Sequence, residues 1–256
     1  MWMARIRLFV DHPLGPGQSV PLTADQAHYL FSVMRLSVGA AVLLFNGHAG
    51  EWRAEIAEAG RRAGRLVCCV ETRPLQPPPD LWLLFAPIKK ARTDFIVEKA
   101  TEMGAARILP VQTDFTNADR IRQDRLQAHA IEAAEQCGGT FVPEVCALRP
   151  LRAVLDSWPQ DRRLMWCDEH LADSVTAHGQ TDFGPTAPTA PTGLAGLTEP
   201  WAIVIGPEGG FSEPEQTRLA QMPQVTRFRL GPRILRADTA AVAALALWQS
   251  ALGDWA

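Results

Sequence analysis

The sequence predicts an α/β protein with two parts, a small and mostly β module followed by a larger domain built on a parallel sheet. Three observations carry this prediction. Up to residue 73, short runs of strand-forming residues are separated by turn signals. Residues 74–80, PLQPPPD, form a stiff proline-rich linker. From residue 81 onward, apolar runs alternate with helical patterns, as in a parallel sheet covered by helices. We therefore expect domains at 1–73 and 81–256.

The first module is expected to contain one helix among its strands. Residues 5–10, RIRLFV, alternate basic and apolar residues and predict the opening strand. Thr23 and Gln26 have the spacing of a capping box, so a helix should begin there and end at Gly39. The remaining strands are predicted at 41–45, 52–56 and 65–71, the first two as a hairpin.

The second domain shows the alternation of a parallel α/β sheet. Its strands are predicted at 81–85, 107–111, 163–166, 201–205 and 226–230. Its helices are predicted at 93–103, 124–136, 213–221 and 239–251. Residues 182–199 are of low complexity and are expected to be a mobile insertion.

Composition narrows the function classes. The chain has 256 residues, of which 47% are hydrophobic, so it can supply a full core. It contains no run of 18 uncharged apolar residues and no signal-peptide pattern, so we expect a cytoplasmic protein without a membrane span. Its five cysteines form no CxxC pair and no metal spacing, which predicts no metal site. A net charge of −3 argues against nucleic-acid binding over the whole surface but leaves room for a local basic patch.

Two glycine loops near the C-terminus are the strongest candidates for a ligand site. Residues 206–210 (GPEGG) follow one apolar run, and residues 231–236 (GPRILR) follow the next. Loops after adjacent strand ends can line one crevice at the edge of a parallel sheet, which is the usual place for a ligand. The GPEGG loop alone is equally consistent with a tight turn or with a backbone cradle around a ligand. No dinucleotide fingerprint, P-loop, GxSxG or HExxH occurs elsewhere in the chain.

Four arginines fall within ten residues around the second loop. Arg227 and Arg229 alternate along the predicted strand, so one face is expected to be solvated. Arg233 and Arg236 lie inside the loop, where a purely solvating role is less obvious. Asp238 is either the N-cap of the last helix or a functional carboxylate.

Together these stretches closely resemble the RsmE family, SPOUT-class enzymes that methylate N3 of a uridine in bacterial 16S ribosomal RNA. The resemblance extends along most of the chain. The matching motifs are RIRLFV at 5–10, His28-Tyr29-Leu30 with Arg35 and Gly39, LFNG at 44–47, EKATEMG at 98–104, EAAEQCG at 132–138, IGPEGG at 205–210, and the stretch from Leu230 to Ala240.

The resemblance implies a fold and a set of partners. It implies an N-terminal PUA-like β-barrel and a C-terminal SPOUT domain whose end is threaded into a trefoil knot. It implies S-adenosyl-L-methionine as cofactor and 16S rRNA or the small ribosomal subunit as substrate. It also implies a homodimer in which the first and last helices of the SPOUT domain, here 93–103 and 239–251, pack across the interface.

Site residues follow from the matched motifs and from the reaction. Arg236 is the candidate that stabilises negative charge on the uracil ring, and Asp238 is a candidate base or a holder of that arginine. The expected cofactor-binding residues are Ile205, Gly206, Glu208, Gly209, Gly210, Leu230, Gly231, Ile234, Leu235 and Thr239. The expected RNA contacts are Arg7, His28, Arg35, Lys89, Lys90 and Arg92. A structural role for His28 and a solvated loop at Lys89 and Lys90 remain open.

The chain departs from the family pattern at three places. Asp238 stands where Glu is usual, Gly139 stands where Arg is common, and Thr116-Asn117 stand where an Arg-Ser pair is expected. Two other functions remain open: ribose 2′-O methylation of RNA, and a non-catalytic RNA-binding or ribosome-assembly role. The intact glycine loops argue against the non-catalytic role, and the PUA-like start and the RILRADTA stretch favour the base methylase.

Overall fold

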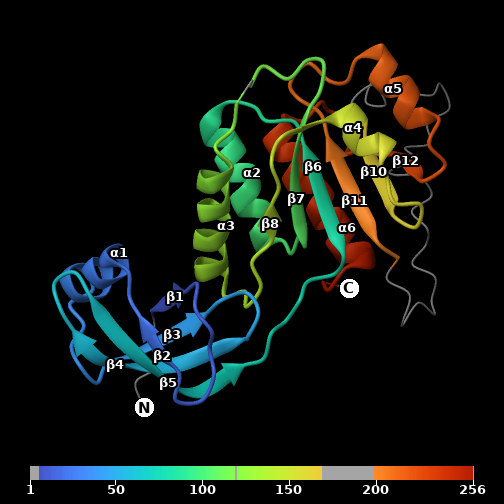
Figure 1. Ribbon diagram of the computed structural model, residues 1–256. Coiled ribbons are helices and arrows are strands. Elements are labelled where there is room, and N and C mark those ends of the chain that lie inside the picture. Colours follow the sequence, from blue (N-terminus) through green and yellow to red (C-terminus); the bar gives the residue numbers. More distant parts are fainter. Residues whose placement is uncertain (1–5, 119, 169–198, 256) are drawn as a thin grey trace. The chain divides into compact units, whose positions relative to one another are not determined.

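A computed structural model describes residues 6–118, 120–168 and 199–255 of the chain (Figure 1). The predicted low-complexity segment 182–199 lies outside these residues except for Glu199. The chain divides into two compact units, Met1–Pro77 with Ala134–Val142, and Pro78–Ala133 with Pro143–Ala256. Residues 134–142 thus belong to the first unit, although the sequence placed them in the second domain. Thr140 explains the difference, because its hydroxyl accepts from Gln76 N at 2.9 Å and contacts Pro74 O at 3.4 Å.

The first unit contains a five-stranded sheet in the order β1-β3-β4-β5-β2 (Figure 1). The strands are β1 Arg7–Phe9, β2 Ser19–Pro21, β3 Ala41–Phe45, β4 Glu51–Ala59 and β5 Gly64–Arg73. β1 pairs parallel with β3, and the other pairs are antiparallel. Alternate side chains such as Val42, Leu44 and Leu66 are fully buried and form the core of this unit. The predicted β module is confirmed.

The helix of the first unit differs in detail from the prediction. The capping box at Thr23 is present, with Gln26 N donating to Thr23 Oγ1 at 3.2 Å and the Gln26 side chain accepting from Thr23 N. The helix α1 Ala24–Ala27 then continues as a π-helix, η1 His28–Val33. Arg35 follows with a φ of 54°. This left-handed conformation is uncommon for a residue with a side chain. The 3.6-residue periodicity therefore predicted a helix but not its type.

The second unit contains a seven-stranded sheet in the order β12-β10-β11-β6-β7-β8, with β9 also paired to β7. Its strands are β6 Leu81–Phe85, β7 Arg107–Gln112, β8 Glu144–Val145, β9 Arg149–Pro150, β10 Arg163–Cys167, β11 Trp201–Ile205 and β12 Val225–Phe228. Every pairing in this sheet is parallel. The predicted parallel sheet is confirmed, and the short strands β8 and β9 were missed because two residues leave no periodic pattern.

Among the described residues, four helices connect successive strands of this sheet, as parallel pairing requires, and a fifth follows the last strand. They are α2 Lys90–Glu102, α3 Gln123–Cys137, α4 Leu151–Asp156, α5 Glu213–Ala220 and α6 Ala237–Leu252. The last helix packs against the first helix of the unit, and Gln249 Nε2 donates to Met103 O at 2.6 Å. β6 and β11 lie in the middle of the sheet, and their apolar side chains are almost all buried. None of the helices described is long and apolar enough to cross a membrane.

Candidate cofactor pocket and active site

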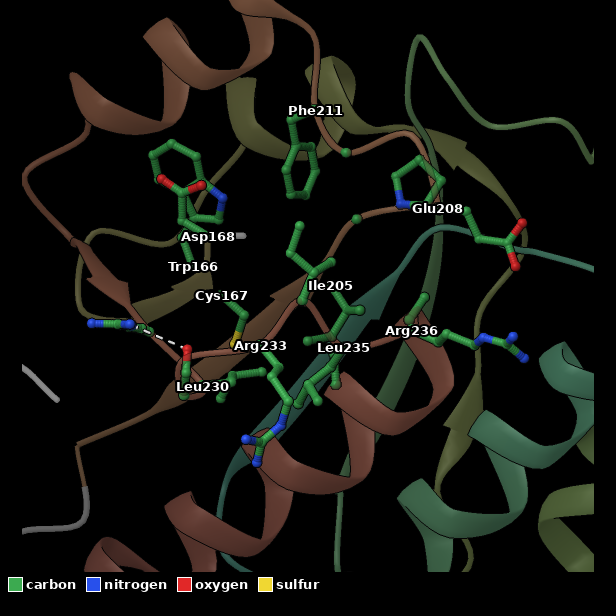
Figure 2. A pocket seen from close by; sticks show the side chains of 18 of the residues that line it. Trp166, Cys167, Asp168, Ile205, Glu208, Phe211, Leu230, Arg233, Leu235 and Arg236 are labelled. Carbon is green, nitrogen blue, oxygen red and sulfur yellow. Dashed lines mark hydrogen bonds between the residues drawn. The ribbon is translucent and has the colours of Figure 1, made fainter. Parts of the chain in front are cut away.

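A cavity of about 270 Å³ lies at the carboxyl ends of β10, β11 and β12 (Figure 2). Most of its lining comes from three segments, the end of β10, the loop after β11 and the loop after β12, and α5 and α6 add a few residues. This is the position that parallel α/β sheets favour for ligands. The two glycine loops singled out in the sequence therefore do meet at one site.

The sheet order corrects one expectation about this site. The loops were expected to follow adjacent strands, but β10 lies between β11 and β12 and pairs with both. Trp166, Cys167 and Asp168 at the end of β10 consequently form a third wall, which the sequence analysis missed. The available signal was the polar Asp168 directly after a buried strand, but strand order is set by pairing and could not be read from the sequence.

The loop after β11 is a tight turn as well as a pocket wall. Gly210 N donates to Pro207 O at 3.0 Å, and Gly210 has a φ of 70°, which favours glycine. A Cβ added to Gly206 would lie only 3.0 Å from the ring of Phe211, so a side chain would crowd the wall there. The tight-turn interpretation of the GPEGG loop is confirmed, and Gly206 and Gly210 also line the cavity. The backbone cradle around a ligand stays a prediction.

The loop after β12 supplies an apolar surface. Gly231 has a φ of 127°, and nothing lies within 4 Å of a Cβ built there. Arg229 Nε donates to Gly231 O at 3.1 Å and fixes the start of the loop (dashed in Figure 2). Ile234 is 63% exposed. Exposing an apolar side chain to water is unfavourable, so contact between Ile234 and an apolar face of a ligand would be stabilising.

The arginines around this loop fall into two groups. Arg227 donates to the buried carboxylate of Asp168, and its guanidinium lies 4.8 Å from the centre of the Trp166 ring. Arg227 is 46% exposed, as expected for a solvated strand face, and its ion pair with Asp168 gives it a structural role as well. Arg233 and Arg236 are exposed and have no ion-pair partner within the described ranges. Their guanidinium groups remain available to a ligand.

Asp238 is not the N-cap of the last helix. That position is held by Arg236, and Asp238 lies in the first turn of α6, where Thr239 N donates to its Oδ1 at 3.0 Å. A carboxylate here is favoured by the helix dipole. A second contact comes from Arg92 on α2, whose Nε lies 3.7 Å from Asp238 Oδ2.

Most of the predicted cofactor residues line the cavity. Those that do are Ile205, Gly206, Glu208, Gly210, Leu230, Gly231, Ile234 and Leu235, together with Arg236. Gly209 and Thr239 lie outside the lining; a Cβ at Gly209 would contact Phe115 at 3.4 Å. Cys167 also lines the cavity, and desolvation raises the pKa of its thiol far above the usual range. A thiol that stays protonated is not a nucleophile, so covalent cysteine catalysis is not expected.

The residues expected to contact RNA differ in the exposure and the ion pairs of their side chains. His28, Arg35, Lys89 and Lys90 are exposed, as contact with RNA requires, and their RNA contacts stay a prediction. Arg92 is instead engaged by Glu208 and Asp238.

Arg7 requires a correction. Its side chain is 12% exposed and pairs with Glu51 at 2.7 Å. It also donates to the carbonyl oxygens of Ala134, Glu135 and Gly139 at 2.6 to 2.8 Å. A guanidinium committed in this way stabilises the first unit and has no free face for a phosphate.

Fold and pocket together define a class of protein, and comparison with known families identifies it. Residues 76–249 match the family described as RNA methyltransferase domain, and residues 22–67 match the RNA methyltransferase PUA domain. The first match covers more than half of the chain. The chain therefore belongs to the RNA methyltransferase family.

Similarity to individual relatives narrows the assignment within this family. The chain is 27% identical to the ribosomal RNA small subunit methyltransferase E of Rickettsia conorii, over 94% of this chain and 93% of the relative. It is 30% identical to the enzyme of the same name from Synechocystis, over 89% and 72%. A crystal structure of this methyltransferase from Neisseria gonorrhoeae, bound to S-adenosyl methionine, superimposes with a TM-score of 0.80 at 25% identity, covering 98% and 99%. The resemblance to the RsmE family is confirmed.

Proposed function

We propose that this protein transfers a methyl group from S-adenosyl-L-methionine to N3 of a uridine in 16S ribosomal RNA. The observation that supports this most directly is the three-walled pocket at the ends of β10, β11 and β12. It combines glycine backbone and apolar side chains with Arg233 and Arg236, which have no ion-pair partner among the described residues, in a chain of the RNA methyltransferase family. The Neisseria gonorrhoeae relative, which aligns over nearly the whole chain, binds that cofactor.

The residues present fit such a cofactor. An adenine ring needs an apolar slot and backbone groups for its edge, and Leu230, Gly231, Ile234 and Leu235 offer both. Gly206, Glu208 and Gly210 close the opposite side. When bound, the cofactor supplies an electrophilic methyl group. The chain supplies the geometry, since in-line displacement depends mainly on how the reactants are held.

The target base must lose the proton on N3, which leaves negative charge on the ring. Arg236 is the proposed stabiliser of that charge, because its guanidinium borders the pocket and has no ion-pair partner among the residues described. In Figure 2, Arg236 and Glu208 extend toward the same side of the pocket. Asp238 is the proposed proton acceptor, or it orients the groups around Arg236.

RNA is proposed to contact the exposed His28 and Arg35 in the first unit and Lys89 and Lys90 at the start of α2. The cofactor-binding end of the second unit is proposed to be knotted, as the family resemblance implies. The protein is proposed to act in the cytoplasm as a homodimer through α2 and α6. Phe95 on α2 and Leu247 on α6, which are 38% and 53% exposed, support that interface.

One experiment tests the function. The protein is incubated with methyl-labelled S-adenosylmethionine and with 16S rRNA, either naked or in small subunits, from a strain lacking this modification. The modified nucleotide is then mapped. We expect label on N3 of a single uridine. Label on a ribose 2′-oxygen would indicate the other methyltransferase reaction, and RNA binding without transfer would indicate the non-catalytic role.

A further inference from the structure

Arg92 connects the glycine loop after β11 to the first turn of α6, the helix that follows the second glycine loop. It lies on α2, and its Nη1 is 3.2 Å from Glu208 Oε1, in the loop after β11. Its Nε is 3.7 Å from Asp238 Oδ2, in the helix that follows the second loop. Its side chain is 29% exposed. Lys89 and Lys90, in the same turn, are exposed and have no ion pair among the residues described, so Arg92 differs from its basic neighbours.

The topology shows why a connection is needed. β11 and β12 share no hydrogen bonds, because β10 lies between them. The two loops can therefore shift relative to each other without breaking a strand pair. A guanidinium can bind two carboxylates at once, since its donors point in several fixed directions. Arg92 is placed to do this from a third element of the fold.

Local hydrogen bonds hold Arg92 in place. The next residue, Thr93, is buried, and its hydroxyl accepts from Ile88 N at 3.0 Å and donates to Ile88 O at 3.1 Å. These bonds fix the first turn of α2. Without the guanidinium, the negative charges of Glu208 and Asp238 would lose the cation that both contact, and their mutual repulsion would no longer be offset.

We propose that Arg92 is a positioning residue, which holds Glu208 and Asp238 together and thereby sets the geometry of the pocket mouth. The proposal rests on the proposed methyl transfer and adds a residue to it. It also replaces the expectation that Arg92 contacts RNA phosphates. An Arg92 engaged by two carboxylates has little attraction left for a third anion.

The test compares Arg92→Ala and Arg92→Lys in the full chain. For Arg92→Ala we expect kcat to fall about tenfold to a hundredfold, because the reacting groups lose their alignment, while KM for RNA stays constant. Affinity for S-adenosylmethionine, measured by calorimetry, should weaken by about threefold to tenfold. Arg92→Lys should recover only part of kcat, because an ammonium group cannot bridge both carboxylates with fixed geometry.

A matched control excludes a general effect of losing an ion pair. Arg218 pairs with Asp156 at 3.1 Å and its side chain is 48% exposed. Neither residue lines the pocket. Arg218→Ala should leave kcat and cofactor affinity unchanged. Combining Arg92→Ala with Glu208→Gln should cost less than the sum of the two single changes, as expected for residues in contact.

Two results would overturn the proposal. The first is an Arg92→Ala protein in which kcat and cofactor affinity are unchanged but the slope of log affinity for RNA against log salt concentration falls by about one. That result would indicate that Arg92 contacts a phosphate. The second applies if the wild-type protein binds S-adenosylmethionine but methylates no RNA: an Arg92→Ala protein whose cofactor affinity equals that of the wild type. In that case the proposed reaction fails separately, and calorimetry alone decides the role of Arg92: weakened cofactor binding in Arg92→Ala supports it.

Discussion

The arginines around Glu51 in the first unit and the arginines beside the pocket in the second unit have opposite roles. In the first unit, Arg7 and Arg73 surround Glu51, which is 3% exposed, and Arg7 also binds three backbone carbonyl oxygens. In the second unit, Arg233 and Arg236 lie beside the pocket with no ion-pair partner among the described residues. An arginine whose donors are all committed stabilises the fold, whereas one with free donors can bind a ligand. The number of arginines in a stretch does not distinguish these roles.

The pKa of Glu51 shows how strongly Arg7 and Arg73 stabilise its carboxylate. Burial alone would raise the pKa of Glu51, but hydrogen bonds from Arg73, Arg7 and Thr72 lower it from 4.5 to about 2. Since the folded-state pKa lies below the ordinary value, this carboxylate stabilises the fold fully above pH 4.5. That contribution is lost as pH falls from about 4.5 toward 2.

The largest expected effect is therefore on stability, from Glu51→Gln. The substitution leaves Arg7 buried without its counter-charge, which should lower the free energy of unfolding by about 3 kcal/mol. Urea unfolding followed by circular dichroism measures this change, and the difference from wild type should shrink between pH 4.5 and 2. Glu58→Gln, at an exposed pair with Arg65, is the control and should leave the midpoint unchanged. An equally stable Glu51→Gln protein would contradict the structural role of Arg7.

The second effect is on turnover, from Arg236→Ala. Removing the charge that stabilises the uracil anion should reduce kcat by about a hundredfold to a thousandfold, with cofactor binding and stability retained. Single-turnover methylation and calorimetry measure the two quantities separately. Arg152→Ala, at a side chain that is 91% exposed on α4, should change neither. If calorimetry shows lost cofactor binding, Arg236 belongs to the cofactor site and not to catalysis.

The third effect is on cofactor affinity, from Gly231→Ala. A Cβ would have space there, so any loss comes from backbone strain at a φ of 127°. Such strain costs about 1 to 3 kcal/mol, and we expect cofactor affinity to fall by about tenfold. Gly15→Ala is the control, because a Cβ at Gly15 also meets nothing within 4 Å and its φ is not in the left-handed region. Unchanged affinity would show that the loop does not need this backbone conformation.

The smallest effect is expected from Asp238→Glu. The 3.7 Å separation between Asp238 Oδ2 and Arg92 Nε is longer than an ordinary hydrogen bond, so one more methylene should shorten it. We expect kcat to stay constant or to rise by about twofold. A tenfold loss in single-turnover assays would mean that the pocket is adapted to the shorter carboxylate. This variant thus tests whether the departure from the usual Glu matters.

The sequence predicted the general architecture well, for a simple reason. Period-two and period-3.6 patterns reflect which side chains face the core, and that information is local. The same holds for the capping box at Thr23 and for the glycine loops, whose chemistry depends on a few neighbouring residues. Family resemblance added the cofactor and the substrate class, because the motifs at 205–210 and 230–240 are specific in combination.

Pairing between distant segments could not be predicted in this way. The sequence by itself determined most of the strands, the two glycine loops and the family. Only the tertiary structure decided that β10 lies between β11 and β12, so that Trp166 and Asp168 line the pocket. It also decided that Arg7 is buried against Glu51 and that Arg92 bridges the loop after β11 and the start of α6. The physical reason is that the role of a charged side chain depends on which partners surround it, and those partners lie far away along the chain.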